Sequence, residues 1–204
     1  MKYGTLDLDH IEALVNKLGG MDGVERFLRG ELTVSEPPRN WRKQDGVIYF
    51  SVMSDGKTGE EWIEYLERKK FDVGKYTKSV LRSKDFKPTY GITTEIAVLR
   101  GLLFADDVRI TSNIRAEAER RTFTKPNAEI ACLIRAKFTD KEIEAMGLWG
   151  IITMHDPIED SAGVLRLLGA DRDGNGCRLH VFRGIPDDRW SREAGFAFSV
   201  AQVS

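Results

Sequence analysis

Acidic and amide side chains alternate in the stretch ADRDGNG, residues 170–176, at the spacing that opens a calcium-binding loop. The oxygen ligands of such a loop would be Asp171, Asp173 and Asn175. The second half of the loop is missing, because Leu179 and Phe182 occupy its ninth and twelfth positions. We therefore expect the turn of a hairpin and no bound metal. A weak cation site at these three residues, closed by Asp187 or Asp188, is the alternative.

Two histidines lie in segments that are expected to share one sheet. His155 is followed by Asp156, which could orient its imidazole as a general base, and His180 stands between Arg178 and Arg183. The arginines could stabilise developing phosphate charge. These residues suggest a small metal-independent nuclease or hydrolase, which is the alternative to a non-enzymatic interaction protein. Histidines in strands are more often structural, and no recognisable Ser or Cys nucleophile motif accompanies these two.

The densest cluster of charge lies between Tyr65 and Tyr90, a stretch that contains eight basic residues and three acidic ones. The basic residues are Arg68, Lys69, Lys70, Lys75, Lys78, Arg82, Lys84 and Lys87. Phe71, Tyr76 and Phe86 are interleaved with them, so bases could stack on the exposed rings while the cations hold phosphates. This pattern favours nucleic-acid contact through residues 68–87, with Tyr76 among the contacts. A solvated helix face is the alternative.

Three other chemistries are disfavoured by spacing or charge, although an anion at the helix N-terminus after Thr58 stays an alternative. Gly56-Lys57-Thr58 lacks the upstream glycine of a phosphate-binding loop, since Ser51 stands there. The sequence contains no Cys-x-x-Cys pair and no local group of three ligands, so it does not predict a zinc site. A DNA-reading second helix at 140–144 would carry three acids and one lysine, which phosphate would repel. We expect no cofactor.

The bulk composition is that of an ordinary globular protein. The 204 residues are 41% hydrophobic, and 31 basic and 32 acidic residues leave a formal net charge of -1, so no global field favours a polyanionic partner. The first residues lack the apolar stretch of a signal peptide, and no run is long enough to span a membrane. These features predict a cytoplasmic protein without a membrane partner. Cys132 and Cys177 have apolar neighbours and are expected to be reduced.

Hydrophobic spacing predicts helices through most of the chain. Ile11, Leu14 and Leu18 form one stripe that ends at Gly19-Gly20, and a second short helix is expected to begin at Asp22, with Glu25 completing a capping box. Capping boxes at Thr58 and Thr139 begin two later helices. The expected helices after the N-terminal pair cover 58–70, 75–83, 93–104, 107–121, 125–137 and 140–147.

Strands are expected at 47–54 and, after residue 148, in four runs of period two. The order of elements predicts an α+β fold with an N-terminal helical pair, a central helical layer and a C-terminal antiparallel β-sheet of three to four strands. The Pro-Pro pair within 31–46 marks a linker. We therefore expect a helical pair at 1–30, a linker at 31–46 and a main α+β domain at 47–204.

Three segments look familiar: NKLGGMDGVERFLRGELTV, TKPNAEIACLIRAKFTDKEIEAMGLW and GFAFSVAQV. They resemble a group of hypothetical bacterial proteins without an assigned function, and the resemblance implies a bacterial origin. Together, these observations favour a non-enzymatic interaction protein whose partner is an unknown protein or a nucleic acid. The N-terminal helical pair could also dock on a second copy, so a homodimer is possible.

Overall fold

The computed structural model describes residues 7–33, 39–173 and 176–201, and it divides the chain into two compact units that meet between Arg39 and Asn40. The first unit holds helices α1 (Leu8–Leu18) and α2 (Met21–Leu28). The Asp7 side chain caps α1, and Gly19 ends it with a φ of 90°, a left-handed conformation that suits glycine.

The start of the second helix differs from the prediction. Helix α2 begins at Met21, and its N-cap is Gly20, whose missing side chain makes no capping hydrogen bond. Asp22 instead lies inside the first turn, where its negative charge interacts favourably with the positive end of the helix dipole. A side chain at Gly23 would collide with the Leu18 carbonyl oxygen, so this glycine lets the two short helices approach closely.

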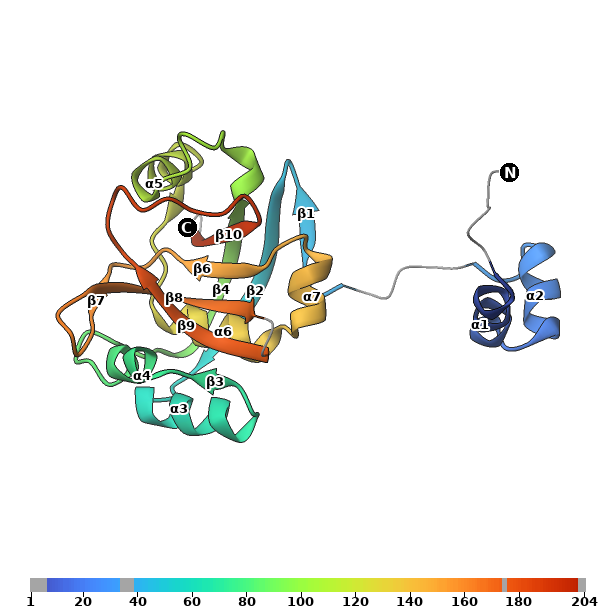
Figure 1. Ribbon diagram of the computed structural model, residues 1–204, viewed down its shortest axis with the longest axis horizontal. Coiled ribbons are helices and arrows are strands. Elements are labelled where there is room, and N and C mark those ends of the chain that lie inside the picture. Colours follow the sequence, from blue (N-terminus) through green and yellow to red (C-terminus); the bar gives the residue numbers. More distant parts are fainter. Residues whose placement is uncertain (1–6, 34–38, 174–175, 202–204) are drawn as a thin grey trace. The chain divides into compact units, whose positions relative to one another are not determined.

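The second unit is built on one mixed sheet of ten strands in its described residues (Figure 1). The main path runs in the order β1-β2-β4-β10-β6-β8-β9-β3, while β5 pairs with β10 and β7 with β8. The strands are β1 (Arg42–Gln44), β2 (Val47–Asp55), β3 (Asp72–Val73), β4 (Tyr90–Arg100), β5 (Phe123–Thr124), β6 (Gly150–Thr153), β7 (Ile158–Glu159), β8 (Leu165–Asp173), β9 (Gly176–Arg183) and β10 (Ala194–Val200).

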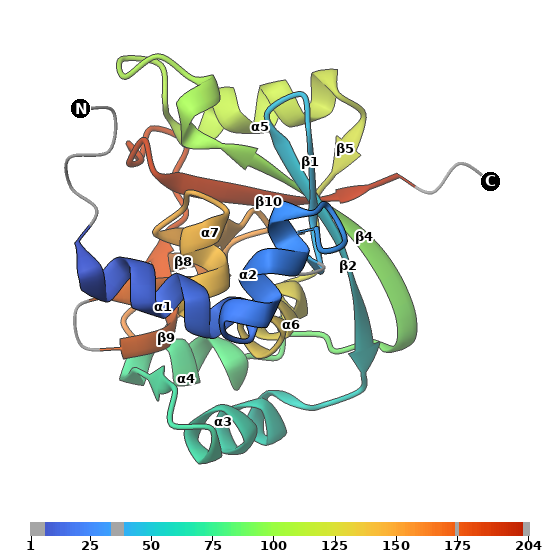
Figure 2. The ribbon, with the colours of Figure 1, turned by 90° about the vertical axis from the view of Figure 1, so that its right-hand side faces the viewer.

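Helices cover both faces of this sheet (Figure 2). Helix α5 packs on one face, and α3, α4, α6 and α7 pack on the other. The helices are α3 (Gly59–Arg68), α4 (Lys75–Leu81), α5 (Thr111–Arg120), α6 (Glu129–Lys137) and α7 (Asp140–Ala145), with a 3-10 turn at Gly101–Leu103. The capping boxes predicted at Thr58 and Thr139 are both present and begin α3 and α7.

The α+β class is confirmed, but the predicted layout of the sheet is wrong in two respects. The sheet is far larger than three or four strands, because β2 and β4 from the first half of the domain belong to it. It is also mixed, since β10 pairs with β6 in parallel and with β4 antiparallel. The predicted linker likewise ends early, because residues 42–44 form β1 against β2.

The helix predicted over 93–104 is strand β4 for most of its length. Residues Ile96 to Leu99 are fully buried, with Ile96 and Val98 in the core under α3 and α6, and Ala97 and Leu99 in the core under α5. A strand buried on both faces shows a continuous apolar run rather than alternation. The apolar run at residues 96–99 therefore has a sequence pattern that a buried helix would also show.

The hairpin predicted at ADRDGNG is confirmed. Strands β8 and β9 pair antiparallel, and Asp173 opposite Gly176 is the last pair before the connection at 174–175, which lies outside the described residues.

Cys132 is a buried free thiol, and burial raises its pKa well above the ordinary value. Among the described residues, no helix is long and apolar enough to cross a membrane.

Candidate nucleic-acid interface

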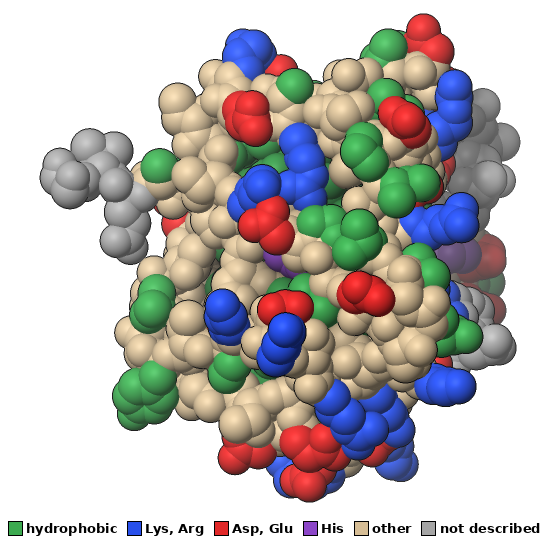
Figure 3. Space-filling view, turned by 90° about the vertical axis from the view of Figure 1, so that its left-hand side faces the viewer, with side chains coloured by type: hydrophobic (Ala, Val, Ile, Leu, Met, Phe, Trp, Pro, Cys, Tyr) green, Lys and Arg blue, Asp and Glu red, His purple; other side chains and the backbone are tan. Residues whose placement is uncertain are grey.

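The basic segment 68–87 runs from the end of α3 through β3 and α4 to the loop before β4. Its cations lie on the surface, and Lys78 is the one that is half-buried. Lys and Arg side chains gather at the lower end of the molecule, where α3 and α4 lie, with acidic side chains among them (Figure 3). The structure therefore presents most of this charge to solvent.

Two of the eight cations are neutralised by helix α3. The Lys78 ammonium lies 2.5 Å from a Glu67 carboxylate oxygen, and the Arg82 guanidinium donates two hydrogen bonds of 2.7 Å to Glu60. The hydrogen bonds from Arg82 lower the pKa of Glu60. These pairs join α3 to α4, so they contribute to the packing of the two helices.

The other six cations have no carboxylate within 4 Å among the described residues. They are Arg68, Lys69, Lys70, Lys75, Lys84 and Lys87. Unpaired surface cations keep their full charge available to a phosphate. We call this set, together with Tyr76, the basic surface.

The interleaved aromatic residues divide into buried and exposed ones. Phe86 is 6% exposed and belongs to the core, and Phe71 is half-buried beneath the Arg135 guanidinium, 5.0 Å from its ring centroid. Tyr76 is 41% exposed. The Lys75 ammonium lies 5.8 Å and the Arg166 guanidinium 5.5 Å from the Tyr76 ring centroid. Tyr76 is thus the ring of the segment that could stack on a base.

His155 is buried, and both of its ring nitrogens are engaged by the backbone. It is 2% exposed, its Nδ1 lies 2.7 Å from the Asp156 carbonyl oxygen, and its Nε2 accepts a hydrogen bond of 2.9 Å from the Leu168 N–H. Nδ1 must therefore carry the proton and donate it to Asp156. Burial lowers the pKa of His155 to about 4, so the ring is neutral at pH 7.

His180 does not share hydrogen bonds with His155. It lies opposite Gly169 in the β8–β9 ladder, and its ring packs edge-on against Phe182 at 5.2 Å. Burial also lowers the pKa of His180. With both nitrogens of His155 engaged, an acid–base pair of the two histidines has no geometric support. The nuclease alternative remains a prediction, which alanine variants and an RNA-cleavage assay would test.

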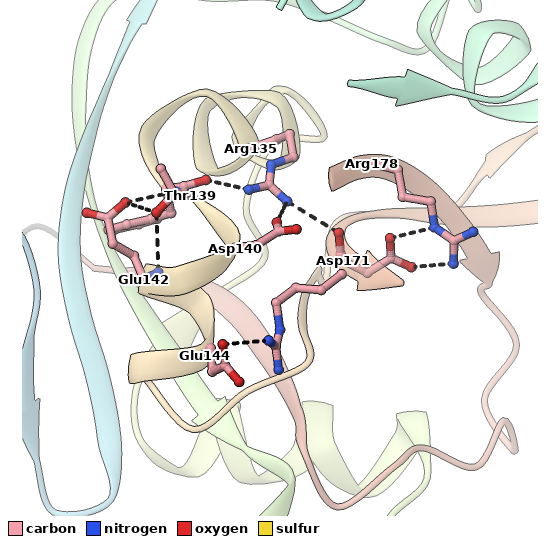
Figure 4. A network of polar contacts seen from close by, with 9 residues as sticks. Arg135, Thr139, Asp140, Glu142, Glu144, Asp171 and Arg178 are labelled. Carbon is pink, nitrogen blue, oxygen red and sulfur yellow. Dashed lines mark hydrogen bonds and ion pairs between the residues drawn. The ribbon is translucent and has the colours of Figure 1, made fainter. Parts of the chain in front are cut away.

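The carboxylate of Asp171, the first residue of the calcium-loop pattern, already forms an ion pair within the protein. It is 1% exposed, and Arg178 donates two hydrogen bonds to its carboxylate, at 2.9 and 3.2 Å (Figure 4). The Asp173 side chain and Asn175 lie outside what the structure describes. Arg183, the other arginine of the histidine hypothesis, is exposed at the end of β9. No group of three metal-ligating side chains is found in the described part of the chain.

Beside this ion pair lies a buried arginine that sequence reasoning did not single out. Arg135 is 0% exposed, and it donates to the carbonyl oxygens of Phe138 and Asp171 and to the Asp140 carboxylate (Figure 4). It therefore ties the end of α6 to α7 and β8. The sequence signal was weak, because Arg135 is one cation among the apolar residues of α6.

A second unforeseen feature is a pair of hollows beside α5. They have volumes of about 370 and 360 Å³, and both are lined by Arg115, Glu119 and Lys125. Lys125 pairs with Asp156 at 2.6 Å, while Arg115 donates to the His155 carbonyl oxygen at 2.8 Å. Two cations and two carboxylates line the hollows, so their charge balance does not favour an anion.

The sequence matches no protein-family model, and it has no significant match among curated proteins or solved structures. The resemblance to hypothetical bacterial proteins therefore stays a prediction. Any functional assignment must come from the chemistry of the surface itself.

Proposed function

We propose that this protein is a non-enzymatic binding protein that contacts single-stranded nucleic acid through the basic surface. The observation that carries the proposal is the setting of Tyr76, an exposed ring with the Lys75 ammonium close to it. The Arg166 guanidinium also lies near the ring but is paired with Asp160 at 2.7 Å, so Lys75 is the cation beside the ring that is available to a phosphate. An aromatic platform beside cations matches a single strand, whose bases stack while its phosphates bind the cations. Lys75 is one of six unpaired cations that the described residues of the segment 68–87 expose to solvent.

Two of the residues that the sequence suggested for chemistry are already engaged within the fold. His155 has both nitrogens bonded, and the Asp171 carboxylate is held by Arg178. A general base needs a free lone pair within reach of a substrate proton. His155 has no free lone pair, and the Asp171 carboxylate is ion-paired and only 1% exposed, so a substrate cannot reach it.

The test is fluorescence anisotropy of a labelled oligo(dT) at about 50 and 200 mM salt. We expect Lys75→Gln with Lys84→Gln to weaken binding about tenfold at the lower salt, because two phosphate contacts are lost. The salt dependence should also become shallower, by about 0.7 in the logarithmic slope for each lost contact.

The matched control removes the same number of charges from the same helix region. Lys78→Gln with Arg82→Gln takes away two cations that are already paired with Glu67 and Glu60. Its affinity should fall by less than about threefold, as expected for a change in the general field. Equal loss in both variants would show that only net charge matters, and no binding at 50 mM salt would overturn the proposal.

Tyr76 provides an independent arm of the same experiment. Tyr76→Ala should cost about 1 to 3 kcal/mol of binding free energy, whereas Tyr76→Phe keeps the ring and should bind as the original protein does. Because Tyr76 is partly exposed, both variants are expected to keep the fold. Unchanged binding by Tyr76→Ala would remove the stacking contact from the proposal.

A further inference from the structure

The N-terminal unit, which holds α1 and α2, leaves its large apolar side chains in contact with solvent. Among its described residues, 7–33, only Gly23 is buried. Six large apolar side chains are between 40% and 81% exposed: Leu8, Ile11, Leu14, Met21, Phe27 and Leu28. Helices of 11 and 8 residues are too short to be stable in water without packing. The helical pair therefore needs a partner that covers this surface.

The two helices carry their apolar residues at the same spacing. Apolar side chains occupy the first, fourth, seventh and eighth positions of each helix: Leu8, Ile11, Leu14 and Val15 in α1, and Met21, Val24, Phe27 and Leu28 in α2. In heptad notation these are positions a, d and g, a wider stripe than the a and d seam of a two-stranded coiled coil. A stripe of this width is typical of a helix that packs against more than one other helix in a bundle.

The pair by itself gives each helix a single helical neighbour. Val15, Leu18 and Val24 are half-buried, whereas the side chains at the far ends of the two helices, such as Leu8 and Leu28, stay largely exposed. One side of each stripe is therefore uncovered. A second helical pair would give every helix the second neighbour that its stripe requires.

Charge disfavours two other classes of partner for the helical pair. Its described residues contain six acidic side chains and three lysines or arginines. Nucleic acid and anionic membrane surfaces attract helices whose polar face is basic, so an acidic excess disfavours both. The spacing and the charge together favour a helical protein surface.

The exposed area agrees with the area that a dimer needs. The six apolar side chains leave roughly 600 Å² of surface in water, and a standard interface buries about 800 Å² on each partner, rather more than half of it apolar. A patch of this size is large for a surface that stays uncovered. A second copy brings the same area and the same stripes to the interface.

We propose that the N-terminal helical pair is a dimerisation surface, on which the helical pair of a second copy packs to form a four-helix assembly. Both partners of a two-fold interface present the same patch, and here that patch is made of two stripes with one spacing. The inference concerns α1 and α2 alone and does not rest on the proposed function.

The experiment is sedimentation equilibrium of the full chain at concentrations from about 1 to 100 µM. We expect the mass of two chains at the upper end, with a Kd of about 10 µM or tighter. Ile11→Lys with Leu14→Lys places two charges in the stripe of α1, where the partner would have to bury them. This variant should have the mass of one chain at every concentration.

Ala13→Lys with Asn16→Lys is the matched control, because it adds the same two charges to exposed positions of α1 outside the stripe. It should dimerise as the original protein does. Ile11→Ala with Leu14→Ala removes apolar area without adding charge and keeps a high helix propensity, so it should weaken the dimer at least about tenfold. A thermal melt of each variant checks that the main unit is folded.

A single-chain mass for the unmodified protein at about 100 µM would overturn the proposal, whatever the variants do. A dimer that persists in Ile11→Lys with Leu14→Lys would also overturn it, because the copies would then meet through another surface. The same would follow from an equal loss in the control variant, since the charge of α1 rather than coverage of its stripe would then govern association. Oligonucleotide binding plays no part in this experiment, so failure of the proposed function would leave its result in place.

Discussion

The His155 Nε2 atom accepts a hydrogen bond of 2.9 Å from the Leu168 N–H, and this contact links the segment after β6 to strand β8. A ring nitrogen can accept a hydrogen bond from a backbone N–H only while it carries no proton itself. The bond therefore exists only while the imidazole is neutral. It makes the stability of the fold depend on pH.

The protein should lose stability as the pH falls from about 6.5 to about 4. The pKa of His155 is lowered by burial to about 4 in the folded chain, so in this range the unfolded chain takes up the proton and the folded chain resists it. The stabilisation is fully present above the unfolded pKa and is lost through this window. The loss between pH 7 and pH 4.5 should be roughly 2 kcal/mol, measured by urea unfolding at the two pH values.

A His155→Gln variant separates this effect from the titration of the carboxylates. It should be less stable at pH 7 and should show a smaller loss between pH 7 and pH 4.5 than the original protein. An identical pH dependence in both proteins would show that His155 does not titrate in this way.

Arg135→Lys should destabilise the protein by about 2 to 4 kcal/mol, as measured by the urea midpoint. A lysine ammonium cannot reproduce the planar fork that reaches the Phe138 carbonyl oxygen and the Asp140 carboxylate together. Lys137→Arg on the same helix is the control, because Lys137 is exposed and should shift stability by less than about 0.5 kcal/mol. Similar small effects at both positions would refute the role assigned to Arg135.

Two glycines at the start of neighbouring helices should differ in their sensitivity to substitution by alanine. At Gly59 a Cβ atom would lie 1.8 Å from the Leu81 carbonyl oxygen, so Gly59→Ala must push α3 away from α4 and cost about 1 to 3 kcal/mol. At Gly74, the N-cap of α4, no atom lies within 4 Å of that position, and the change should be within about 1 kcal/mol of neutral. Thermal unfolding compares them directly, and an equal loss would contradict the close helix contact.

Calcium should give no binding heat up to about 1 mM in calorimetry. The Asp171 carboxylate would have to leave Arg178 before it could bind a cation, and both groups are largely withdrawn from solvent. Asp171→Asn should leave this null result unchanged while lowering the melting temperature. Saturable heat that disappears in the Asp171→Asn variant would instead establish a cation site at the hairpin.

Local rules predicted the parts of the fold that depend on a few neighbouring residues. The capping boxes at Thr58 and Thr139 were correctly predicted because their hydrogen bonds span only three residues. The strand character of residues 96–99 was missed, since it depends on helices that cover both faces of a sheet built from distant segments. Short-range patterns carry no information about such coverage.

The same distinction applies to the candidate sites. The charges of the segment 68–87 were visible as a run of lysines and arginines, but the pairing of Lys78 with Glu67 and of Arg82 with Glu60 depends on how α3 packs against α4. The hollow at the end of β9 joins Trp149, which precedes β6, to Phe182 in β9. No spacing in the sequence could have brought them together.

Strand β10 is made after every other strand, yet it is the only link between β4 and β6 in the described sheet. A nascent chain that has not yet released residues 194–200 from the ribosome holds two separate half-sheets, each with an unpaired inner edge. Exposed edges of this kind invite pairing with other chains. We therefore expect the growing polypeptide to depend on chaperones until its final strand emerges, and stalled or truncated chains to be prone to aggregation.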